Sequence, residues 1–195
     1  MRKAELHRKT GETDIDIGIN IDGTGKSNIK TPIGFLTHML ETFAKHSGFD
    51  IRARITGDID VDQHHTVEDT GIVLGEVIKK ALGEKKGIKR AGFFIFPMDE
   101  VLTLSSVDIS GRAFLVHDIP FEDKFTGGFQ NDLLIDFLRA FSGTLGASIH
   151  VKVFYGRSDH HKIESVFKSL ARALKEAVSV EYGMEDMVPS TKGVL

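Results

Sequence analysis

The chain has 195 residues, of which 41% are hydrophobic and 27% are charged, and its formal net charge is −3. These values are typical of an ordinary globular protein, and they exclude the strongly basic balance expected of a protein that binds nucleic acid or an anionic membrane. The absence of cysteine excludes disulfide bonds and thiolate metal sites, so the nine histidines direct any metal chemistry towards nitrogen and oxygen ligands.

The N-terminus and the longest apolar runs bear on where the protein acts. Met1–Arg8 has no apolar core, so we do not expect it to be a secretion signal. No apolar run approaches the about 18 residues that a membrane-spanning helix needs. We therefore expect a cytoplasmic protein that has neither nucleic acid nor a membrane as its partner.

The hydrophobic pattern of the first half predicts four strands and two helices. Residues 13–22 alternate between apolar and polar side chains, which is the period of a half-buried strand. Phe35, Leu36, Met39 and Leu40 instead recur at helical spacing. In chain order we expect strands at 2–8, 13–22 and 27–31, a helix at 35–46, a strand at 49–56 and a helix at 70–82.

The second half repeats this order of segments. We expect strands at 92–96, 101–106 and 113–117, a helix at 131–143, a strand at 148–155 and a final helix that ends near residue 180. Residues 185–195 are expected to form a C-terminal tail.

A short motif occurs twice, each time before the last helix of a half. His64-His65-Thr66-Val67-Glu68 returns 96 residues later as His160-His161-Lys162-Ile163-Glu164. We therefore predict a single domain over residues 1–195, built from two repeats (about 1–88 and 89–184) and the tail (about 185–195). The expected fold is α/β of the α+β type, with internally duplicated β-β-β-α-β-α half-domains whose sheets pack with helices on one side.

Each HHxxE motif offers a metal two imidazoles and a carboxylate within one helical turn. Residues four apart share a face of a helix, so the first histidine of each motif, His64 or His160, lies beside the motif's glutamate. The second histidine points about 100° away. Each motif is therefore expected to serve two metal ions.

The internal repeat also aligns His38, in the helix before the first motif, with Asp136, in the helix before the second. Both side chain types bind metals. Eight ligands divide into two sites of four, which leaves about two positions on each ion for substrate or water and suits Mn, Fe, Co, Ni or Zn rather than Mg or Ca. The candidate ligands are His38, His64, His65, Glu68, Asp136, His160, His161 and Glu164.

A second kind of site would bind an anion. Arg90, Arg112, Ser190 and Lys192 offer guanidinium, hydroxyl and ammonium donors that suit a phosphate group. The tail that carries Ser190 and Lys192 could close over such a ligand as a flap. The residues alone thus indicate a two-metal site that acts on a small anionic ligand.

Six motifs extend this interpretation, and they span nearly the whole chain. They are Phe-Leu-x-His-Met-Leu at 35–40, Asp-x-His-His-Thr-Val-Glu-Asp at 62–69, Pro-Met-Asp-Glu at 97–100, Asp-Ile-Ser-Gly-Arg at 108–112, His-His-x-x-Glu at 160–164 with Phe167-Lys168, and Pro-Ser-Thr-Lys-Gly-Val-Leu at 189–195. In combination they resemble the imidazoleglycerol-phosphate dehydratase family of histidine biosynthesis. The resemblance implies a duplicated α/β fold, two Mn²⁺ ions per subunit, and a 24-subunit homo-oligomer built from trimers with active sites between subunits.

The resemblance also implies an activity, the dehydration of D-erythro-imidazole glycerol phosphate to imidazole acetol phosphate, and roles for particular residues. One metal would take His64, His160 and Glu164, with Asp136 at a position where the family often has histidine, and the other would take His38, His65, Glu68 and His161. Glu12 matches a glutamate that contacts substrate. The phosphate contacts match Arg90, Arg112, Ser190 and Lys192, with Lys168 as a further candidate.

The expected mechanism draws on the imidazole ring, because the hydroxyl that leaves is not activated by itself. Metal ions on the two ring nitrogens would stabilise an imidazolate, whose electrons expel the hydroxyl through a diazafulvene-like intermediate. The candidate groups for moving protons are Glu12, Glu68 and Glu164, with the roles of acid and base open.

Two other functions fit the same histidines. A binuclear-metal hydrolase of a small phosphorylated substrate would hold its ions about 4 Å apart to activate water. A metal-storage or purely structural assembly would close each coordination shell with protein ligands.

Overall fold

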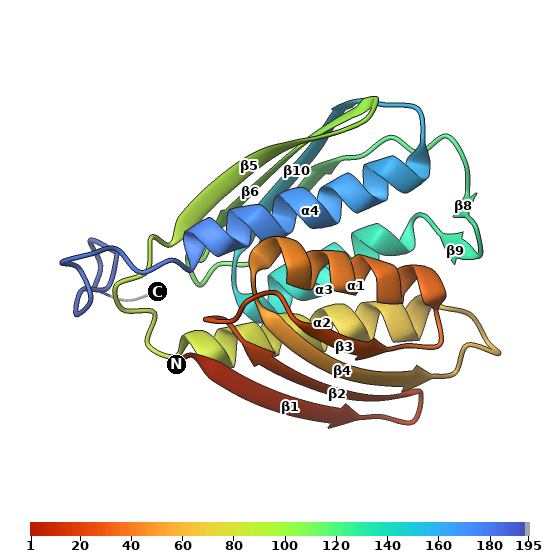
Figure 1. Ribbon diagram of the computed structural model, residues 1–195. Coiled ribbons are helices and arrows are strands. Elements are labelled where there is room, and N and C mark those ends of the chain that lie inside the picture. The colour runs from red at the N-terminus through yellow and green to blue at the C-terminus, as the bar shows by residue number, and fades with distance from the viewer. Residues whose placement is uncertain (194–195) are drawn as a thin grey trace.

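The computed structural model describes residues 1–193 and consists of two sheets that enclose a layer of helices (Figure 1). The first sheet has the strand order β1-β2-β4-β3. Its strands are β1 (Lys3–Lys9), β2 (Thr13–Asn20), β3 (Ser27–Lys30) and β4 (Asp50–Gly57), and the helices of this half are α1 (Gly34–Ser47) and α2 (His64–Leu82).

The second sheet has the strand order β5-β6-β10-β7. Its strands are β5 (Ala91–Met98), β6 (Val101–Asp108), β7 (Phe114–Asp118) and β10 (Ser148–Tyr155). A small hairpin, β8 (Phe125–Thr126) with β9 (Phe129–Gln130), precedes α3 (Leu133–Leu145), and α4 (Asp159–Ala177) ends the half.

The pairing of the strands confirms the predicted fold class. In the first sheet β2 pairs antiparallel with β1 and β4, whereas β3 runs parallel to β4. In the second sheet β6 pairs antiparallel with β5 and β10, whereas β7 runs parallel to β10. Both halves therefore have the order β-β-β-α-β-α with the same topology, apart from the added hairpin β8–β9. The exact repeat boundaries at 88 and 184 stay a prediction.

Two segments differ from the sequence-based expectation, and a third agrees with it. Helix α2 begins already at His64, so the whole first motif is helical. The hairpin β8–β9 was not expected, because its two-residue strands are too short to show a period. From residue 181 to residue 193 the chain forms turns without helix or strand, which agrees with a tail, and residues 194–195 of that tail lie outside the described part. None of the described helices has the length and apolarity to cross a membrane.

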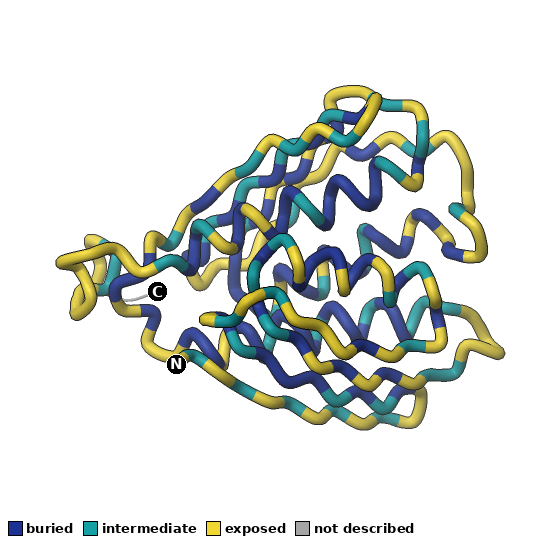
Figure 2. The backbone as a smooth tube through the Cα atoms, viewed as in Figure 1, coloured by how far each residue is buried: buried dark blue, intermediate teal, exposed yellow. Residues whose placement is uncertain are grey.

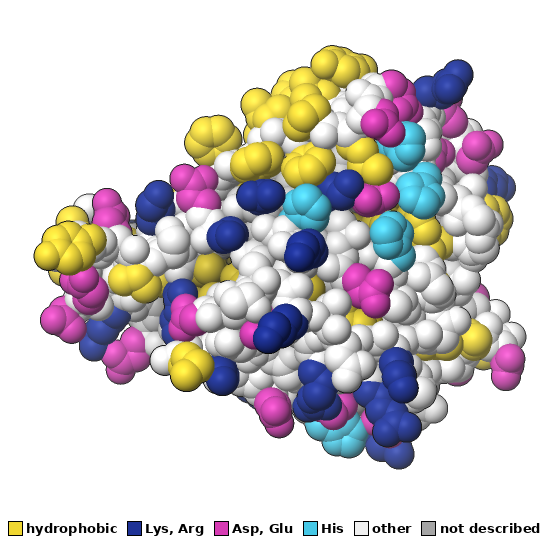
Figure 3. Space-filling view, in the orientation of Figure 1, with side chains coloured by type: hydrophobic (Ala, Val, Ile, Leu, Met, Phe, Trp, Pro, Cys, Tyr) yellow, Lys and Arg dark blue, Asp and Glu magenta, His cyan; other side chains and the backbone are white. Residues whose placement is uncertain are grey.

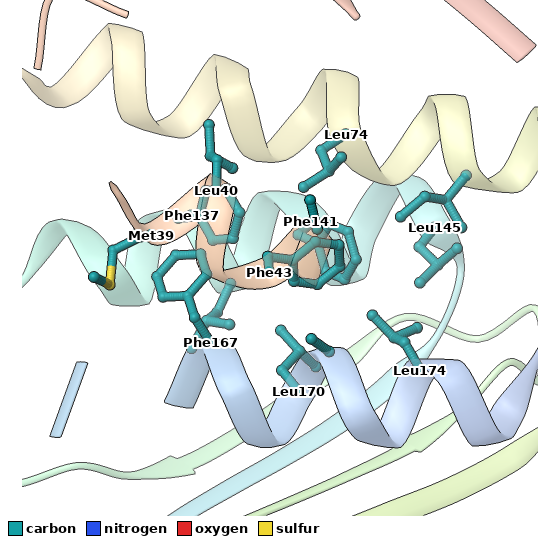
Figure 4. Close-up of a cluster of buried hydrophobic side chains, with 14 of the residues drawn as sticks. Met39, Leu40, Phe43, Leu74, Phe137, Phe141, Leu145, Phe167, Leu170 and Leu174 are labelled. Carbon is teal, nitrogen blue, oxygen red and sulfur yellow. The ribbon is translucent and has the colours of Figure 1, made fainter. Parts of the chain in front are cut away.

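The four helices pair between the repeats rather than within them. Helix α1 of the first half packs against α4 of the second, and α2 packs against α3. Side chains from all four helices meet in one core, where Phe43 lies edge-on to Phe141, and Phe137 lies against both Phe141 and Phe167 (Figure 4). The burial of the chain is greatest along these helix faces (Figure 2). Because the core is shared, the two repeats form one folding unit.

Two glycines bring α2 and α3 unusually close together. A Cβ atom at Gly71 would lie 2.5 Å from the carbonyl oxygen of Phe137, and one at Gly75 would lie 2.6 Å from that of Phe141. Distances this short are closer than any real carbon–oxygen contact, so only glycine allows this approach. The equivalent positions on α4, Phe167 and Ala171, carry side chains.

The close approach predicts the effect of adding one methyl group. We expect Gly71→Ala to lower the free energy of unfolding by about 1–3 kcal/mol, because α2 must move away from α3. Gly143→Ala on α3 is the matched control, since a Cβ there meets nothing within 4 Å, and it should leave stability unchanged or raise it by up to about 1 kcal/mol. Urea unfolding of both variants measures the difference, and equal stabilities would contradict the role given to Gly71.

Candidate metal centre

The first candidate metal cluster lies where α1 crosses α4. His38, His160 and Glu164 offer ligand atoms that all lie within 4.8 Å of one another. The Nε2 atoms of His38 and His160 are 3.6 and 3.3 Å from Oε2 of Glu164. Histidines gather beside acidic side chains on this face of the molecule (Figure 3). Two imidazoles and a carboxylate at these distances suit a transition-metal ion.

A second cluster lies between α2 and α3, but its two carboxylates face opposite nitrogens of one ring, so the three groups do not converge on one point as those of the first cluster do. Nε2 of His64 lies 3.4 Å from Oε2 of Glu68, and Nδ1 of the same ring lies 3.4 Å from Oδ2 of Asp136. Asp136 also accepts a hydrogen bond from Arg139, 3.0 Å away. His38 and Asp136, which the internal repeat aligns, thus each face the first histidine of the other repeat's motif. Each cluster is built from both repeats.

The glutamates of the two motifs differ in their surroundings. The side chain of Glu164 is only 11% exposed and accepts a hydrogen bond of 2.8 Å from Lys168, which also lies over the ring of Phe96. Burial alone would raise the pKa of Glu164, but the hydrogen bond and charge of Lys168 outweigh it and lower the pKa. The side chain of Glu68 is 45% exposed, and residue 72, the equivalent of Lys168, is isoleucine. Within this chain Lys168 therefore pairs with Glu164, one of the candidate metal ligands.

The second histidine of each motif turns towards a loop, as the helical spacing predicts. Nδ1 of His65 lies 3.0 Å from Oδ2 of Asp58, and Nε2 lies 3.8 Å from Glu12 in the β1–β2 turn. Nδ1 of His161 lies 2.9 Å from Glu100 in the β5–β6 turn. The hydrogen bond that His65 donates to Asp58 raises the pKa of His65, whereas the hydrogen bond from His161 lowers the pKa of Glu100 to about 2.

Side chains at the helix N-termini fix the direction of both motifs. The hydroxyl of Ser158 accepts a hydrogen bond from the backbone N–H of His161, and the carboxylate of Asp62 accepts one from the backbone N–H of His64. Each satisfies a donor that the first helical turn leaves free. The start of each helix, and with it the first histidine, is therefore held in place.

A buried ion pair fastens the second motif to the long loop before α3. Lys162 and Asp159 are 3 residues apart on α4, 1% and 5% exposed, and joined at 2.9 Å. Lys162 also donates to the carbonyl of Pro120, and Asp159 accepts from the backbone N–H groups of Glu122 and Asp123. All the polar atoms of the pair thus have partners, which burial of two charges requires.

We expect Asp159→Asn to lower the free energy of unfolding by about 3–5 kcal/mol, because it leaves the Lys162 ammonium buried without its countercharge. Asp118→Asn removes one carboxylate from an exposed pair with Lys152 and should cost at most about 1 kcal/mol. Chemical unfolding of the two variants provides the comparison. A cost below 1 kcal/mol for Asp159→Asn would show that the buried pair contributes little.

The candidate phosphate ligands are only partly brought together within one chain. Arg90, whose backbone φ is 70°, holds Asp108 with two hydrogen bonds of 2.6 and 3.0 Å and donates a third to the carbonyl of Pro189. That bond ties the Ser190 segment of the tail to Arg90. Arg112 is exposed in the turn before β7, and within residues 1–193 no hydrogen bond joins it to Arg90 or Lys192. The predicted phosphate set stays a prediction.

Three acidic residues near the histidines were not singled out from the sequence. They are Asp58, Asp99 and Glu100, and the last two form a second group with His161 that could hold a metal. Two features of the sequence pointed to these residues: the Pro-Met-Asp-Glu motif at 97–100 contains Asp99 and Glu100, and the acidic loop after residue 57 contains Asp58. The donor set as a whole, imidazole and carboxylate with no thiolate, fits a divalent transition metal.

Comparison with known proteins decides between the open alternatives. The family model described as imidazoleglycerol-phosphate dehydratase matches residues 31–174. The chain belongs to the imidazoleglycerol-phosphate dehydratase family. It is therefore a hydro-lyase of histidine biosynthesis, and the alternative of a binuclear hydrolase is not favoured.

Relatives and solved structures of this dehydratase family cover the chain almost completely. The dehydratases of Methylorubrum populi and Thermoanaerobacter pseudethanolicus are 50% and 52% identical to it over 195 residues, covering 100% of both chains in each case. The dehydratase structure from Pyrococcus furiosus matches with a TM-score of 0.85 at 39% identity, covering 97% of this chain and 100% of that one. The structure from Staphylococcus aureus matches with a TM-score of 0.83 at 34% identity, covering 92% and 99%. The family is metal-dependent, which agrees with the two clusters.

Proposed function

We propose that this protein dehydrates imidazole glycerol phosphate to imidazole acetol phosphate at a site built from the two histidine clusters, with two Mn²⁺ ions per subunit. The observation that carries the proposal is that the histidines and carboxylates of both motifs gather where a helix of one repeat packs against a helix of the other. Bound at the two ring nitrogens of the substrate, divalent ions would supply Lewis-acid stabilisation of negative charge on the ring. The residues of the chain then have to hold the ions, orient the substrate and move two protons.

We assign the ligands to two sites as the family resemblance implies. One site takes His64, His160 and Glu164, with Asp136 as an additional carboxylate. The other takes His38, His65, Glu68 and His161. Within one chain His38 instead lies with His160 and Glu164, so this assignment is a proposal for the assembled oligomer, in which a second chain completes each site.

The exposed carboxylate of Glu12 is the best candidate for proton transfer. It is 54% exposed, its close partner among residues 1–193 is the ring of His65 at 3.8 Å, and it projects from a tight turn. Glu164, by contrast, is held by Lys168, which keeps it ionised and suits a metal ligand. Glu68 is free of a lysine but lies beside His64. We therefore assign proton transfer to Glu12, and metal binding to the two motif glutamates, Glu68 and Glu164.

The phosphate end of the substrate is assigned to the cationic residues Arg90, Arg112, Lys168 and Lys192, with Ser190. Arg90 supports this role because its link to Pro189 keeps the tail beside the sheet. Holding the phosphate at one end and the ring at the other converts binding energy into orientation of the hydroxyl that leaves. A biosynthetic enzyme of this kind is expected in the cytoplasm.

An apolar surface supports the proposal that the protein is a homo-oligomer, a 24-mer built from trimers. The outer face of the second sheet, away from α4, exposes Phe93 (62%), Ile95 (48%), Phe114 (65%), Val116 (43%) and Phe154 (45%). Hydrophobic side chains gather along the upper edge of the molecule in Figure 3. The outer face of the first sheet is charged instead, with ion pairs such as Arg52–Asp16. Exposed large apolar side chains gathered on one sheet face are typical of a subunit interface.

Removal of metal tests the assignment of ligands. We expect protein stripped of divalent metal to lose dehydratase activity and Mn²⁺ to restore it. His64→Ala and His161→Ala should each lower the bound metal, measured by elemental analysis, by about one ion per chain, because each removes a ligand from a different site. His117→Ala, outside both clusters, is the control. Two ions retained in both variants would refute the assignment.

A charge on the apolar face tests the interface. We expect Phe93→Asp to shift the protein to smaller species in size-exclusion chromatography with light scattering, because an ionised side chain cannot be buried between subunits without a partner. Arg54→Asp on the outer face of the first sheet is the control and should leave the assembly unchanged. An unchanged mass for Phe93→Asp would place the interface elsewhere.

A further inference from the structure

The second histidine of each motif, His65 or His161, makes the same kind of contact with a carboxylate. Nδ1 of His65 faces both oxygens of Asp58, at 3.0 and 3.3 Å, and Nδ1 of His161 faces Oε2 of Glu100 at 2.9 Å. In both cases it is the Nδ1 side of the ring that meets a carboxylate within hydrogen-bond distance.

The two carboxylates do not correspond in the internal repeat. Asp58 follows β4, and the position that follows the equivalent strand glycine, Gly156, is Arg157. Glu100 comes from the β5–β6 turn, whose equivalent in the first half is the β1–β2 turn. The same contact is therefore made from two different loops, so it is not a by-product of the duplication.

The carboxylate of Glu100 and the backbone of Asp58 are held independently of the histidines that they face. Glu100 accepts a 2.8 Å hydrogen bond from the backbone N–H of Ser158, the residue that caps α4. The backbone N–H of Asp58 donates to the carbonyl of Glu12 at 3.1 Å. Their side chains are 27% (Asp58) and 38% (Glu100) exposed. The carboxylate of Glu100 is thus oriented before any ligand binds, whereas at Asp58 it is the backbone that is held.

An ionised carboxylate can only accept a hydrogen bond, so the ring nitrogen that faces it must carry the proton. In a neutral imidazole the lone pair then lies on the other nitrogen, Nε2. A histidine fixed in this way presents Nε2 to a metal and does not have to change its tautomer on binding.

We propose that Asp58 and Glu100 are positioning residues that lock His65 and His161 as Nδ1–H tautomers with Nε2 directed to the metal. Because Asp58 does this in the first half, the carboxylate of the equivalent hairpin turn, Glu12, is left free to move the substrate proton. Glu12 approaches Nε2 of His65 at 3.8 Å, and Asp99 of the β5–β6 turn approaches Nε2 of His161 at the same distance. This division of roles rests on the proposed function. The two turns in matching places each carry a carboxylate 3.8 Å from Nε2 of a second histidine, and the β5–β6 turn carries Glu100 in addition.

A competing arrangement uses Glu100 itself as a ligand, since Asp99, Glu100 and His161 could together hold an ion. A substitution of Glu100 by glutamine distinguishes a hydrogen-bond acceptor from a metal ligand. Glutamine accepts the Nδ1–H hydrogen bond through its amide oxygen, but it is a poor substitute for an anionic metal ligand.

The test compares Glu100→Gln with Glu100→Ala and Asp58→Asn with Asp58→Ala, with Glu76→Gln on α2 as a charge-matched control. The first readout is the tautomer of each histidine ring in metal-free protein, from the ¹⁵N chemical shifts of the imidazole nitrogens. We expect Nδ1–H for His65 and His161 in the wild type, in both amide variants and in the control. Each alanine variant should populate the Nε2–H tautomer of its own histidine only.

The second readout is a titration with Mn²⁺ alone. We expect the alanine variants to bind one of the two ions about 10–100-fold more weakly, and the amide variants to stay within about threefold of wild type. Unchanged tautomers in both alanine variants would overturn the proposal. Loss of one ion in Glu100→Gln as complete as in Glu100→Ala would show that Glu100 is a ligand, and would overturn it too.

Glu12→Gln tests the role of Glu12 in proton transfer. We expect its Mn²⁺ affinity and histidine tautomers to match wild type while kcat falls at least about 100-fold, as for loss of a group that transfers a proton. A fall in metal affinity with kcat retained would overturn the role given to Glu12. The tautomers are measured without metal or substrate, so they report on Asp58 and Glu100 even if the wild-type protein fails to dehydrate imidazole glycerol phosphate.

Discussion

The candidate site depends on the packing of each helix against a helix from the other repeat. His38 reaches Glu164 only because α1 lies on α4, and His64 reaches Asp136 only because α2 lies on α3. Gly71 and Gly75 set the distance between His64 and Asp136, since any side chain at either glycine would push α2 and α3 apart. The distance between His38 and Glu164 is set by the direct packing of α1 on α4. Ligand geometry and core packing are therefore one constraint, and a change in either alters the other.

Much of the fold could be predicted because its signals are local. The alternation in residues 13–22 and the apolar stripe from Phe35 to Phe43 each lie within one element, so their periods indicate strand and helix directly. The duplication was visible because the HHxxE motif is rare enough to be recognised twice. Alignment of the two copies paired His38 with Asp136 and so identified Asp136 as a candidate ligand. The structure places its carboxylate beside His64.

The parts of the site that could not be predicted depend on contacts between distant segments. Nothing in the sequence around Asp58 or Glu100 says that these side chains meet the second histidines, because that depends on how far each loop rises above the end of its sheet. The same holds for the pair Lys162–Asp159, whose partners on the loop at 120–123 are remote in sequence. The helical spacing did predict that His65 and His161 face away from the motif glutamates, but not what they face.

The exchange of helices between the halves has a consequence for how such a protein could have begun. A free half-domain with one HHxxE helix and one helix of the α1 type could not bring its own two ligand-bearing helices together in this arrangement. Two identical half-domains could, by laying each helix on its partner's, and the dimer would then contain two identical clusters related by a two-fold axis. Fusion of the two genes would make that dimer permanent and let the clusters diverge. Glu164 with its lysine and Glu68 without one, and His38 opposite Asp136, are the differences expected after such a release from symmetry.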